Sequence, residues 1–490
     1  MTFNRRTFLR ISGAGAVAVG VTGASAPAVA APRWDKLRAK LKGPLYLPSD
    51  PGYEGVRTGF MTMFDDHFPA AVAKVARPED VQACVEFAAN HDIPIAARSG
   101  GHGYAGYSTP HQGLVVDLGP LNAIQVHPDG RAVVGAGARL GEVYTAVAKA
   151  GRLLPAGSCA TVGIGGLALG GGIGVLGRKY GLTCDRVISM RVVTPDGRLR
   201  TVSAISEPEL FWALRGGGGG NFGIVTSFTF DTAPARDLSV FALGFVPEAL
   251  PAVLAAWHDW VLSAPDEMWA SIGISGGVQP SFGLEGCFAG PASAAAPILD
   301  DLIRRVGSKP TSRSAKDLSY YATMEYYGGC GDFTAPKCGP SWSGGKGEYA
   351  RGAYVGASRM ISAPLSDPAR FAEVVTATPT MYTIVDTFGG AIARGDSAFP
   401  HRDATSSTQI LLDVGPSTGD EAAVRRQVGQ VRDEIGKMTG PTGYVNYLDP
   451  EMPDWAHAYY GRNLPRLRRV ASRYDPDGLF AFAQGLSTKD

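Results

Sequence analysis

The chain has 490 residues, more than a single hydrophobic core of roughly 250–300 residues accommodates, so two domains are expected. Its 45% apolar and 19% charged residues are typical of a globular protein and exclude a largely disordered chain. The net charge of +1 offers no electrostatic basis for binding nucleic acid or an anionic membrane surface.

The first 30 residues have the features of an export signal. Arg5 and Arg6 precede a weakly apolar run at residues 11–23, and a small-residue cleavage signal follows at Ala28-Val29-Ala30. The run is too short and too rich in small residues to span a membrane. The paired arginines favour the bacterial twin-arginine route, which exports folded proteins, and an ordinary secretory signal is the alternative. We therefore expect a secreted protein without a membrane span.

After a lead-in arm at residues 31–66, strand and helix patterns alternate over residues 67–236, which we expect to form the first domain. Strands are predicted at 71–76, 93–98, 114–118, 132–136, 187–193, 199–202 and 224–230, and helices at 78–90 and 140–150. The character changes near residues 231–234. The second domain is expected at 237–440, with strands at 269–274 and 408–412 and helices at 251–262, 293–306 and 419–438.

The six cysteines form no C-x-x-C pair, which argues against a zinc knuckle or a thioredoxin motif. Cys84 lies in a helical pattern and is expected to be buried. Cys330 and Cys338 flank a loop and are a candidate disulfide in an oxidising compartment. Cys159 stands alone in a glycine-rich loop, which is an unusual place for a structural cysteine.

Glycine, with 65 residues, gathers in three tracts at 99–108, 157–174 and 216–223. Dense glycine loops either turn the backbone tightly or let it approach a ligand, and their N–H groups cradle phosphates. Three tracts in one domain favour a large phosphate-bearing ligand over turns alone. His102 and Cys159 each lie inside one of these loops, where either side chain by itself is more often an ordinary loop residue.

Two motifs in the chain lack the structural setting that their chemistry needs. Gly218, Gly220 and Gly223 fit the dinucleotide pattern G-x-G-x-x-G, but a strand pattern rather than a helix follows, so an NAD site is excluded. The sequence around Ser275 fits G-x-S-x-G but lies in a strand pattern without the strand–turn–helix of a hydrolase.

Several segments, in the same order, resemble the berberine-bridge-enzyme-like FAD-linked oxidases of the vanillyl-alcohol-oxidase superfamily. They are Arg98-Ser99-Gly100-Gly101-His102, Gly157-Ser158-Cys159-Ala160-Thr161-Val162-Gly163, Gly170-Gly171-Gly172-Ile173-Gly174, Arg178-Lys179-Tyr180-Gly181-Leu182, Asn221-Phe222-Gly223-Ile224-Val225 and Val445-Asn446-Tyr447-Leu448-Asp449. The resemblance implies an α+β fold with a two-subdomain, PCMH-type FAD-binding domain. It also implies a substrate domain whose antiparallel sheet is covered by helices, and a C-terminal segment, 441–490, that returns to the FAD domain.

By the same resemblance FAD is the cofactor, bound covalently through His102 to the flavin 8α-methyl group and through Cys159 to flavin C6. No metal is implied. The other residues expected to contact FAD come from the same segments, and they are Arg98, Ser99, Gly100, Gly101, Gly103, Ser158, Thr161, Val162, Gly165, Gly166, Gly170, Gly174, Gly223, Ile224, Val225, Asn446 and Tyr447.

The resemblance also assigns the catalytic base to Tyr447, with Tyr444 as a secondary candidate and Asp386 as a residue that faces the site. A tyrosine with a pKa near ~10 is a weak base at neutral pH, so a nearby cation or hydrogen-bond donor is expected to stabilise its phenolate. Phe388 stands where some relatives carry a second catalytic tyrosine, which weakens a two-tyrosine mechanism. By residue type alone, His67, His401 and His457 are further candidates.

The expected reaction moves a hydride from an alcohol or hemiacetal, of an oligosaccharide or a secondary metabolite, to the flavin and then to O₂, giving H₂O₂. Valine at position 162 accompanies reaction with O₂ in relatives, so an oxidase is expected; a dehydrogenase or a flavin-binding protein without turnover are the alternatives. The expected partners are a small-molecule substrate and O₂. The protein itself is expected to be a monomer. Several aromatic residues of the second domain could line an open sugar-binding groove, or they could belong to the hydrophobic core. They are Trp257, Trp260, Trp269, Tyr320, Tyr321, Tyr326 and Tyr327.

Overall fold

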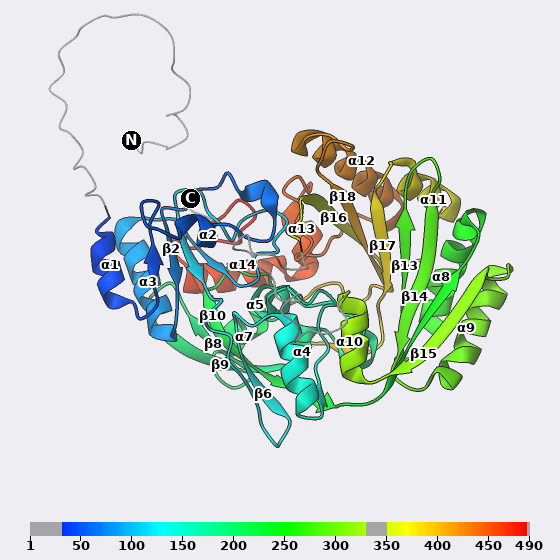
Figure 1. Cartoon of the computed structure of the whole chain (residues 1–490), viewed down its shortest axis with the longest axis horizontal. Coiled ribbons are helices and arrows are strands. Elements are labelled where there is room, and N and C mark those ends of the chain that lie inside the picture. Colours follow the sequence, from blue (N-terminus) through cyan, green and yellow to red (C-terminus); the bar gives the residue numbers. More distant parts are fainter. Residues whose placement is uncertain (1–31, 330–349, 488–490) are drawn as a thin grey trace, which may run out of the picture.

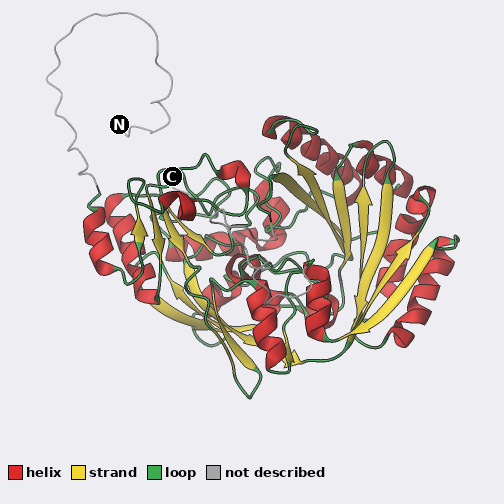
Figure 2. Cartoon of the chain, in the orientation of Figure 1, coloured by secondary structure: helices red, strands yellow, loops and turns green. Residues whose placement is uncertain are grey.

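The computed structural model describes residues 32–329 and 350–487, and it divides into two lobes that face each other (Figure 1). The predicted export signal and the predicted Cys330–Cys338 disulfide lie outside these residues. The described elements mix helices with parallel and antiparallel sheets, which confirms the expected α+β class (Figure 2). None of the helices in the described ranges has the length and apolar character that crossing a bilayer requires.

The first lobe begins with a small, mostly parallel sheet. Its strands, in spatial order, are β1 (Leu45–Tyr46), β2 (Ala71–Lys74), β4 (Leu114–Asp117) and β3 (Ile95–Arg98). Helix α3 (Pro78–His91) starts with proline in its first turn, where no hydrogen bond is lost, and Cys84 on its inner face is fully buried, as expected. The lead-in arm holds α1 (Trp34–Lys40), α2 (Tyr53–Arg57) and β1, and β1 pairs antiparallel with β2.

A second, antiparallel sheet completes the first lobe. Its strands are β5 (Ile124–Val126), β6 (Arg131–Gly135), β10 (Ile224–Asp231), β8 (Val187–Val193) and β9 (Leu199–Ser203) in spatial order. The strand β10 directly follows the third glycine tract, so the excluded NAD fingerprint indeed lacks its helix. Shorter elements surround this sheet, and they are α4 (Leu140–Lys149), β7 (Arg152–Leu153), α5 (Ile164–Gly170), α6 (Gly177–Tyr180), α7 (Pro208–Ala213) and β11 (Ala233–Pro234).

The second glycine tract is less loop-like than expected, because its latter half forms helix α5. Ile164 and Ala168 are buried on its inner side, so core packing offsets the low helix propensity of the glycines. The expectation of a continuous loop across 157–174 was therefore wrong for residues 164–170.

The second lobe is built on a seven-stranded antiparallel sheet. Its spatial order is β15 (Ser312–Leu318), β12 (Leu238–Gly244), β14 (Ser281–Phe288), β13 (Met268–Ser275), β17 (Tyr382–Thr387), β18 (Ser406–Asp413) and β16 (Tyr354–Ile361). Helices α8 (Leu250–Ser263), α9 (Ala292–Val306), α11 (Pro368–Ala377) and α12 (Glu421–Thr439) cover its outer face (Figure 1). The remaining helix, α10 (Tyr320–Gly328), lies beside α4 on the inner side.

Alternation along β13 separates the two faces of this sheet. Ala270, Ile272 and Ile274 pack beneath the outer helices, whereas Trp269 packs with the core of the first lobe. Trp257 and Trp260 on α8 are buried beneath the outer helices, so these two belong to the core and not to a groove.

The C-terminal segment, with α13 (Trp455–Tyr460) and α14 (Leu464–Tyr474), packs against the first lobe. Arg466 of α14 pairs with Glu209 of α7 at 2.6 Å, and Asn221 accepts a hydrogen bond from the backbone of Leu486. The same segment also reaches the second lobe, where the backbone N–H of Tyr444 donates to Ser358 Oγ of β16 at 2.9 Å. Residues 443–449 therefore lie where the two lobes meet.

Candidate functional site

The first and second glycine tracts pack backbone against backbone. A Cβ atom added to Gly100 would collide with the backbone of Gly163, and one added to Gly163 would collide with Ser99. Ser99 Oγ donates to the carbonyl of Ala136 at 2.6 Å, which fixes the first loop to the end of β6. Glycine is therefore required here for the close approach of two loops.

This approach brings His102 and Cys159 to a shared neighbour. Thr161 Oγ1, which is buried, lies 2.9 Å from His102 Nε2 and 3.4 Å from Cys159 Sγ. The imidazole stacks on Phe60 with ring centroids 3.9 Å apart. Burial, together with the positive charge of Arg139, lowers the pKa of His102 to about 3. The imidazole is therefore neutral at physiological pH, the form in which a ring nitrogen can form a covalent bond.

Two further glycines leave open surface, Gly103 in the first loop and Gly166 in helix α5, which follows the second loop. No atom lies within 4 Å of a Cβ built on Gly103 or on Gly166, and both residues are exposed, as is Ser158 beside Cys159. The two loops thus present bare backbone next to His102 and Cys159. Such a surface fits a large, flat ring system, and its exposed N–H groups fit phosphate oxygens.

Several residues predicted to contact the cofactor instead support the loops from behind. The guanidinium of Arg98 is buried and pairs with Asp117 at 2.9 Å, while it also donates to the carbonyl of Arg57 at 2.7 Å in the arm. The packed glycines Gly165, Gly170 and Gly174 have no space for a Cβ. These contacts favour a structural role for the Arg98 side chain.

The start of β10 is similarly enclosed. Ile224 and Val225 are buried, and they pair with Val193 and Val192 of β8. Gly223 adopts a φ of 144° and would collide with the Val193 carbonyl if it carried a Cβ. The side chains at these predicted positions thus belong to the core.

A group of tyrosines lies next to Cys159, at the junction of the lobes. The Tyr104 ring stacks on that of Tyr447 with centroids 6.0 Å apart, and it meets Tyr354 edge-on at 5.3 Å. Gln409 of β18 donates to the Tyr104 hydroxyl. Cys159 is close enough to raise the pKa of both Tyr104 and Tyr354, although burial is the larger cause in each case.

Sequence reasoning missed Phe60, Tyr104, Tyr354 and Gln409. Tyr104 could have been predicted, because it stands two residues after His102 in the same glycine tract. Tyr354 and Gln409 carry no motif, since only the arrangement of β16 and β18 brings them to this place.

Tyr447 does not have the surroundings that a phenolate base needs. Its pKa is raised well above the usual value by burial, and then by the negative charge of Asp386 and by Tyr444 and Tyr354. The expected stabilising cation is not among the groups that shift this pKa in the described chain. Tyr447 is therefore protonated at neutral pH, and its role as the catalytic base stays a prediction.

Asp386 is the group beside Tyr447 that can gain or lose a proton near neutral pH. It lies on β17 directly opposite Ser271 of β13 and is only 9% exposed. Burial raises its pKa to about 7, with a hydrogen bond from Ser271 acting in the opposite direction. Asp386 stays a predicted catalytic residue, now with a physical reason for the choice.

Tyr444 and Asn446 connect the loop that carries Tyr447 to the second glycine tract. The Tyr444 hydroxyl accepts hydrogen bonds from the Gly172 backbone at 2.8 Å and from Asn446 Nδ2 at 2.9 Å, and Asn446 Nδ2 also donates to the Leu167 carbonyl. The Tyr444 ring meets that of Tyr447 edge-on at 4.9 Å. These contacts favour a supporting role for Tyr444 over proton transfer.

The remaining candidates lie apart from this cluster. Phe388 is fully buried and packs on Phe399. His67 Nδ1 bonds the Thr109 carbonyl at 2.8 Å, and His401 is buried beside Phe399. His457 pairs with an aspartate at the surface. None of the three histidines is among the groups that shift the pKa of Tyr447 in the described chain.

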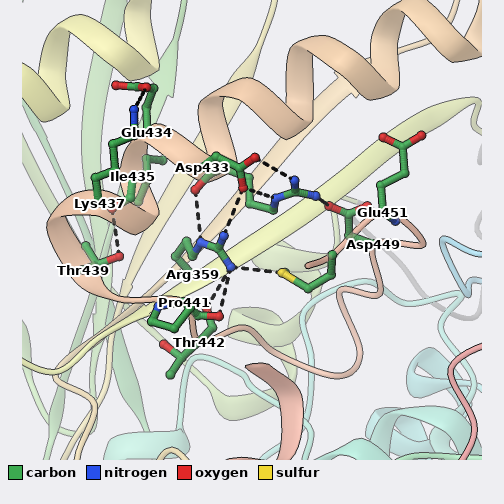
Figure 3. Close-up of polar contacts among 12 residues, drawn as sticks. Arg359, Asp433, Glu434, Ile435, Lys437, Thr439, Pro441, Thr442, Asp449 and Glu451 are labelled. Atoms are coloured by element: carbon green, nitrogen blue, oxygen red, sulfur yellow. Dashed lines mark hydrogen bonds and ion pairs between the residues drawn. The ribbon is translucent and has the colours of Figure 1, made fainter. Parts of the chain in front are cut away.

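A buried ionic network anchors the loop that carries Tyr447 (Figure 3). Arg432 of α12 pairs with Asp449 of the loop, and both side chains are about 5% exposed or less. Arg359 of β16 donates to the carbonyls of Arg432 and Pro441 at 3.1 and 3.2 Å. Burial and the charge of Arg432 lower the pKa of Arg359 to about 10. The position of Tyr447 thus depends on charges contributed by the second lobe.

Comparison with known families gives a match for the segment with the glycine loops and a match for the C-terminal segment. A family described as "FAD binding domain" matches residues 69–203, and one described as "Berberine and berberine like" matches residues 443–487. The first contains both glycine loops with His102 and Cys159, and the second contains Tyr444 and Tyr447.

Relatives match nearly the whole chain. An uncharacterized FAD-linked oxidoreductase of Bacillus subtilis is 32% identical over 92% of this chain and 98% of its own length. A xylooligosaccharide oxidase of Thermothelomyces thermophilus is 32% identical, over 85% and 87% of the two chains. Among solved structures, BBE-like 1 of Physcomitrella patens superposes with a TM-score of 0.84 at 26% identity, covering 93% and 99%. A chitooligosaccharide oxidase gives 0.83 at 26% identity, with the same coverage.

Proposed function

The chain belongs to the berberine-bridge-enzyme-like FAD-linked oxidoreductases, and we propose that it is a secreted oxidase that binds FAD covalently through both His102 and Cys159. Membership of this family makes the protein an FAD-linked oxidoreductase with a PCMH-type fold. The double covalent attachment, the production of H₂O₂ and export are the parts that we add.

One observation carries the proposal: Thr161 Oγ1 lies 2.9 Å from His102 Nε2 and 3.4 Å from Cys159 Sγ, so the two side chains proposed to hold the flavin meet at one hydroxyl group. Two side chains from separate loops thus meet beside open glycine backbone. Burial keeps the imidazole neutral and therefore nucleophilic, and the thiol is partly exposed. Covalent attachment suits an exported enzyme, because a secreted protein cannot replace lost FAD.

The proposed reaction oxidises a CH–OH group of an oligosaccharide hemiacetal or of a secondary-metabolite alcohol. FAD, when bound beside His102 and Cys159, would supply the hydride acceptor and the route of the electrons to O₂. The similarity to a xylooligosaccharide oxidase and a chitooligosaccharide oxidase supports the saccharide.

The protein's part of the chemistry is proton transfer. In this proposal Tyr447, protonated at neutral pH, holds the substrate hydroxyl by a hydrogen bond. Asp386, with a pKa of about 7, accepts the proton, either directly or through the Tyr447 hydroxyl. The proposed base is thus the Asp386 carboxylate, whereas the sequence indicated Tyr447.

Two further features support the oxidase and its export. Val162 follows Cys159 in the loop and is a small side chain of the kind that accompanies reaction with O₂ in relatives. The twin-arginine pattern at Arg5 and Arg6 favours export after FAD has been loaded in the cytoplasm.

The function is tested with the purified protein. A yellow protein whose colour stays in the acid-precipitated pellet is expected, and a panel of oligosaccharides and alcohols should include a substrate that bleaches the flavin and yields H₂O₂ in air. A flavin that bleaches but reoxidises slowly in air would replace the oxidase with a dehydrogenase. A yellow protein that no substrate reduces would indicate flavin binding without turnover.

The attachment is tested by removing each bond. His102→Ala and Cys159→Ala should each keep the flavin in the acid pellet through the remaining bond, because the two linkages are independent. The double variant should release all of it to the supernatant. The exposed His457→Ala and the buried Cys84→Ala serve as controls that keep both bonds. If either single variant has the same flavin spectrum as the unmodified protein, that linkage does not exist.

A further inference from the structure

The inner face of the seven-stranded sheet carries a row of polar side chains that starts at Asp386. Ser271 of β13 lies opposite Asp386 of β17, and Glu285 of β14 lies opposite Ser271. Directly paired residues point to the same face, and strands are ~4.8 Å apart, so Glu285 lies ~10 Å from Asp386. A disaccharide is long enough to span this separation.

The row runs from a buried end to an exposed end. Ser271 and Asp386 are 4% and 9% exposed, whereas Glu285 is exposed. Gly283, two residues before Glu285 on β14, has no atom within 4 Å of a built Cβ. The sheet surface beside Glu285 is thus bare, and it is continuous with the predicted catalytic carboxylate.

Two buried donors on this face lack a partner in the described chain. They are Trp269 Nε1, on a side chain that is 7% exposed, and the Tyr327 hydroxyl of α10. Trp269 lies on the same face as Ser271, two residues along β13, and its ring meets Tyr327 edge-on at 5.6 Å. Because buried polar groups are almost always hydrogen-bonded, an indole N–H in this position indicates a ligand that offers an acceptor.

The charge around Glu285 is negative. Within residues 32–329 and 350–487 no hydrogen bond or ion pair engages its carboxylate, and the described cation on this face is Lys316, on the edge strand β15. Partial desolvation of its carboxyl group, although the residue is exposed, raises the pKa of Glu285. Burial is the largest cause of the raised pKa of Tyr326, Tyr327, Tyr382 and Asp386, and the charge of Glu285 raises each of them further. Tyr326 and Tyr382 are 49% and 42% exposed, and both lie close enough to this carboxylate for its charge to raise their pKa.

We propose that Glu285, Trp269 and Tyr327 form a subsite for the substrate unit next to the oxidised one, and that this unit carries a protonated amine beside a hydroxyl group, as an amino sugar does. The ammonium group binds Glu285 near the tyrosine rings. The hydroxyl oxygen accepts from Trp269 Nε1 and bonds the Tyr327 hydroxyl. This inference rests on the proposed function, because the subsite is defined relative to a reacting carbon beside Asp386.

The test uses three disaccharides with glucose at the reducing end and glucose, glucosamine or N-acetylglucosamine as the second unit. At a pH where the amine is protonated, the FAD-loaded enzyme should have a kcat/KM for the glucosamine compound about 10-fold or more above that for the other two. Glu285→Gln should bring the ratio close to one, mainly through KM. Glu248→Gln, the same change at an exposed position on the outer side, should leave the ratio unchanged.

Direct binding supplies a readout that does not depend on turnover. Calorimetric titration of the glucosamine disaccharide into Asp386→Asn enzyme should show binding that is lost when Glu285→Gln is added. Trp269→Phe, which keeps an aromatic ring but removes the N–H donor, should weaken binding of all three disaccharides.

The outcomes separate this inference from the proposed function. If the three disaccharides are oxidised with equal kcat/KM, the amine subsite is refuted while the oxidase stands. A preference for the glucosamine compound that survives Glu285→Gln would also refute it. If no disaccharide reduces the flavin and none binds, the subsite fails, whereas alcohol oxidation in the substrate panel decides the proposed function separately.

Discussion

Asp386→Asn is expected to lower kcat by about 100- to 10,000-fold, the range found when a general base is lost. The carboxyl must be deprotonated to accept the substrate proton, and burial raises its pKa to about 7. The kcat of the unmodified enzyme should therefore rise as the pH increases through about 7, and the residual activity of Asp386→Asn should lack this rise. Steady-state H₂O₂ formation across this pH range measures both effects.

Tyr447→Phe is the matched comparison, because it removes the hydroxyl that holds the substrate and leaves the carboxylate. Its activity should also fall, but it should keep a pH-dependent rise, since Asp386 is still present. If kcat of the unmodified enzyme rose only at a pH of ~10 or above, where a phenol loses its proton, and this rise were absent from Tyr447→Phe, the role of base would return to Tyr447. Flavin absorbance of each variant shows that the cofactor is still bound.

The same pKa shift has a consequence for stability. Because the folded state binds the Asp386 proton more tightly than the unfolded state does, the stabilising contribution is present at acidic pH. It is lost as the pH rises from the ordinary aspartate range through about 7. Asp386→Asn is neutral at every pH, so above pH 7 it should unfold at a higher temperature than the unmodified enzyme while being far less active.

Asp449→Asn is expected to lower the free energy of unfolding by at most about 3–5 kcal/mol, the range for removing one partner of a buried ion pair, because Arg432 keeps the half-exposed Asp433 as a second partner. Arg432 and Asp449 are 5% and 4% exposed, and Arg359 lies in the same network (Figure 3). Denaturant unfolding followed by fluorescence measures the loss. The kcat should also fall, since Asp449 fixes the loop of Tyr447.

Asp433→Asn is the control, because Asp433 pairs with the same arginine at 2.9 Å but is 49% exposed. Exposed ion pairs are worth roughly 0–1 kcal/mol, so this variant should be nearly as stable as the unmodified protein. Equal losses in the two variants would show that burial of the Arg432–Asp449 pair is not what stabilises the loop.

The cofactor loops were predictable because their constraints are local in sequence. Gly100 and Gly163 must be glycine for the two loops to touch, and this leaves a visible motif around His102 and Cys159. The strand pattern after Gly223 likewise excluded NAD before any fold was known. Helix α5 escaped prediction because burial of Ile164 and Ala168 overrides the low helix propensity of its glycines.

The sequence by itself thus determined the family, the cofactor and the two loops that meet around Thr161. Only the tertiary structure supplied the observations behind the proposed acid–base chemistry. It left Tyr447 half-buried, placed Asp386 close enough to raise the pKa of that tyrosine, and aligned Asp386, Ser271 and Glu285 in one row across three strands. The physical reason is that a pKa depends on burial and neighbouring charge, and strand register, which no local motif encodes, determines both.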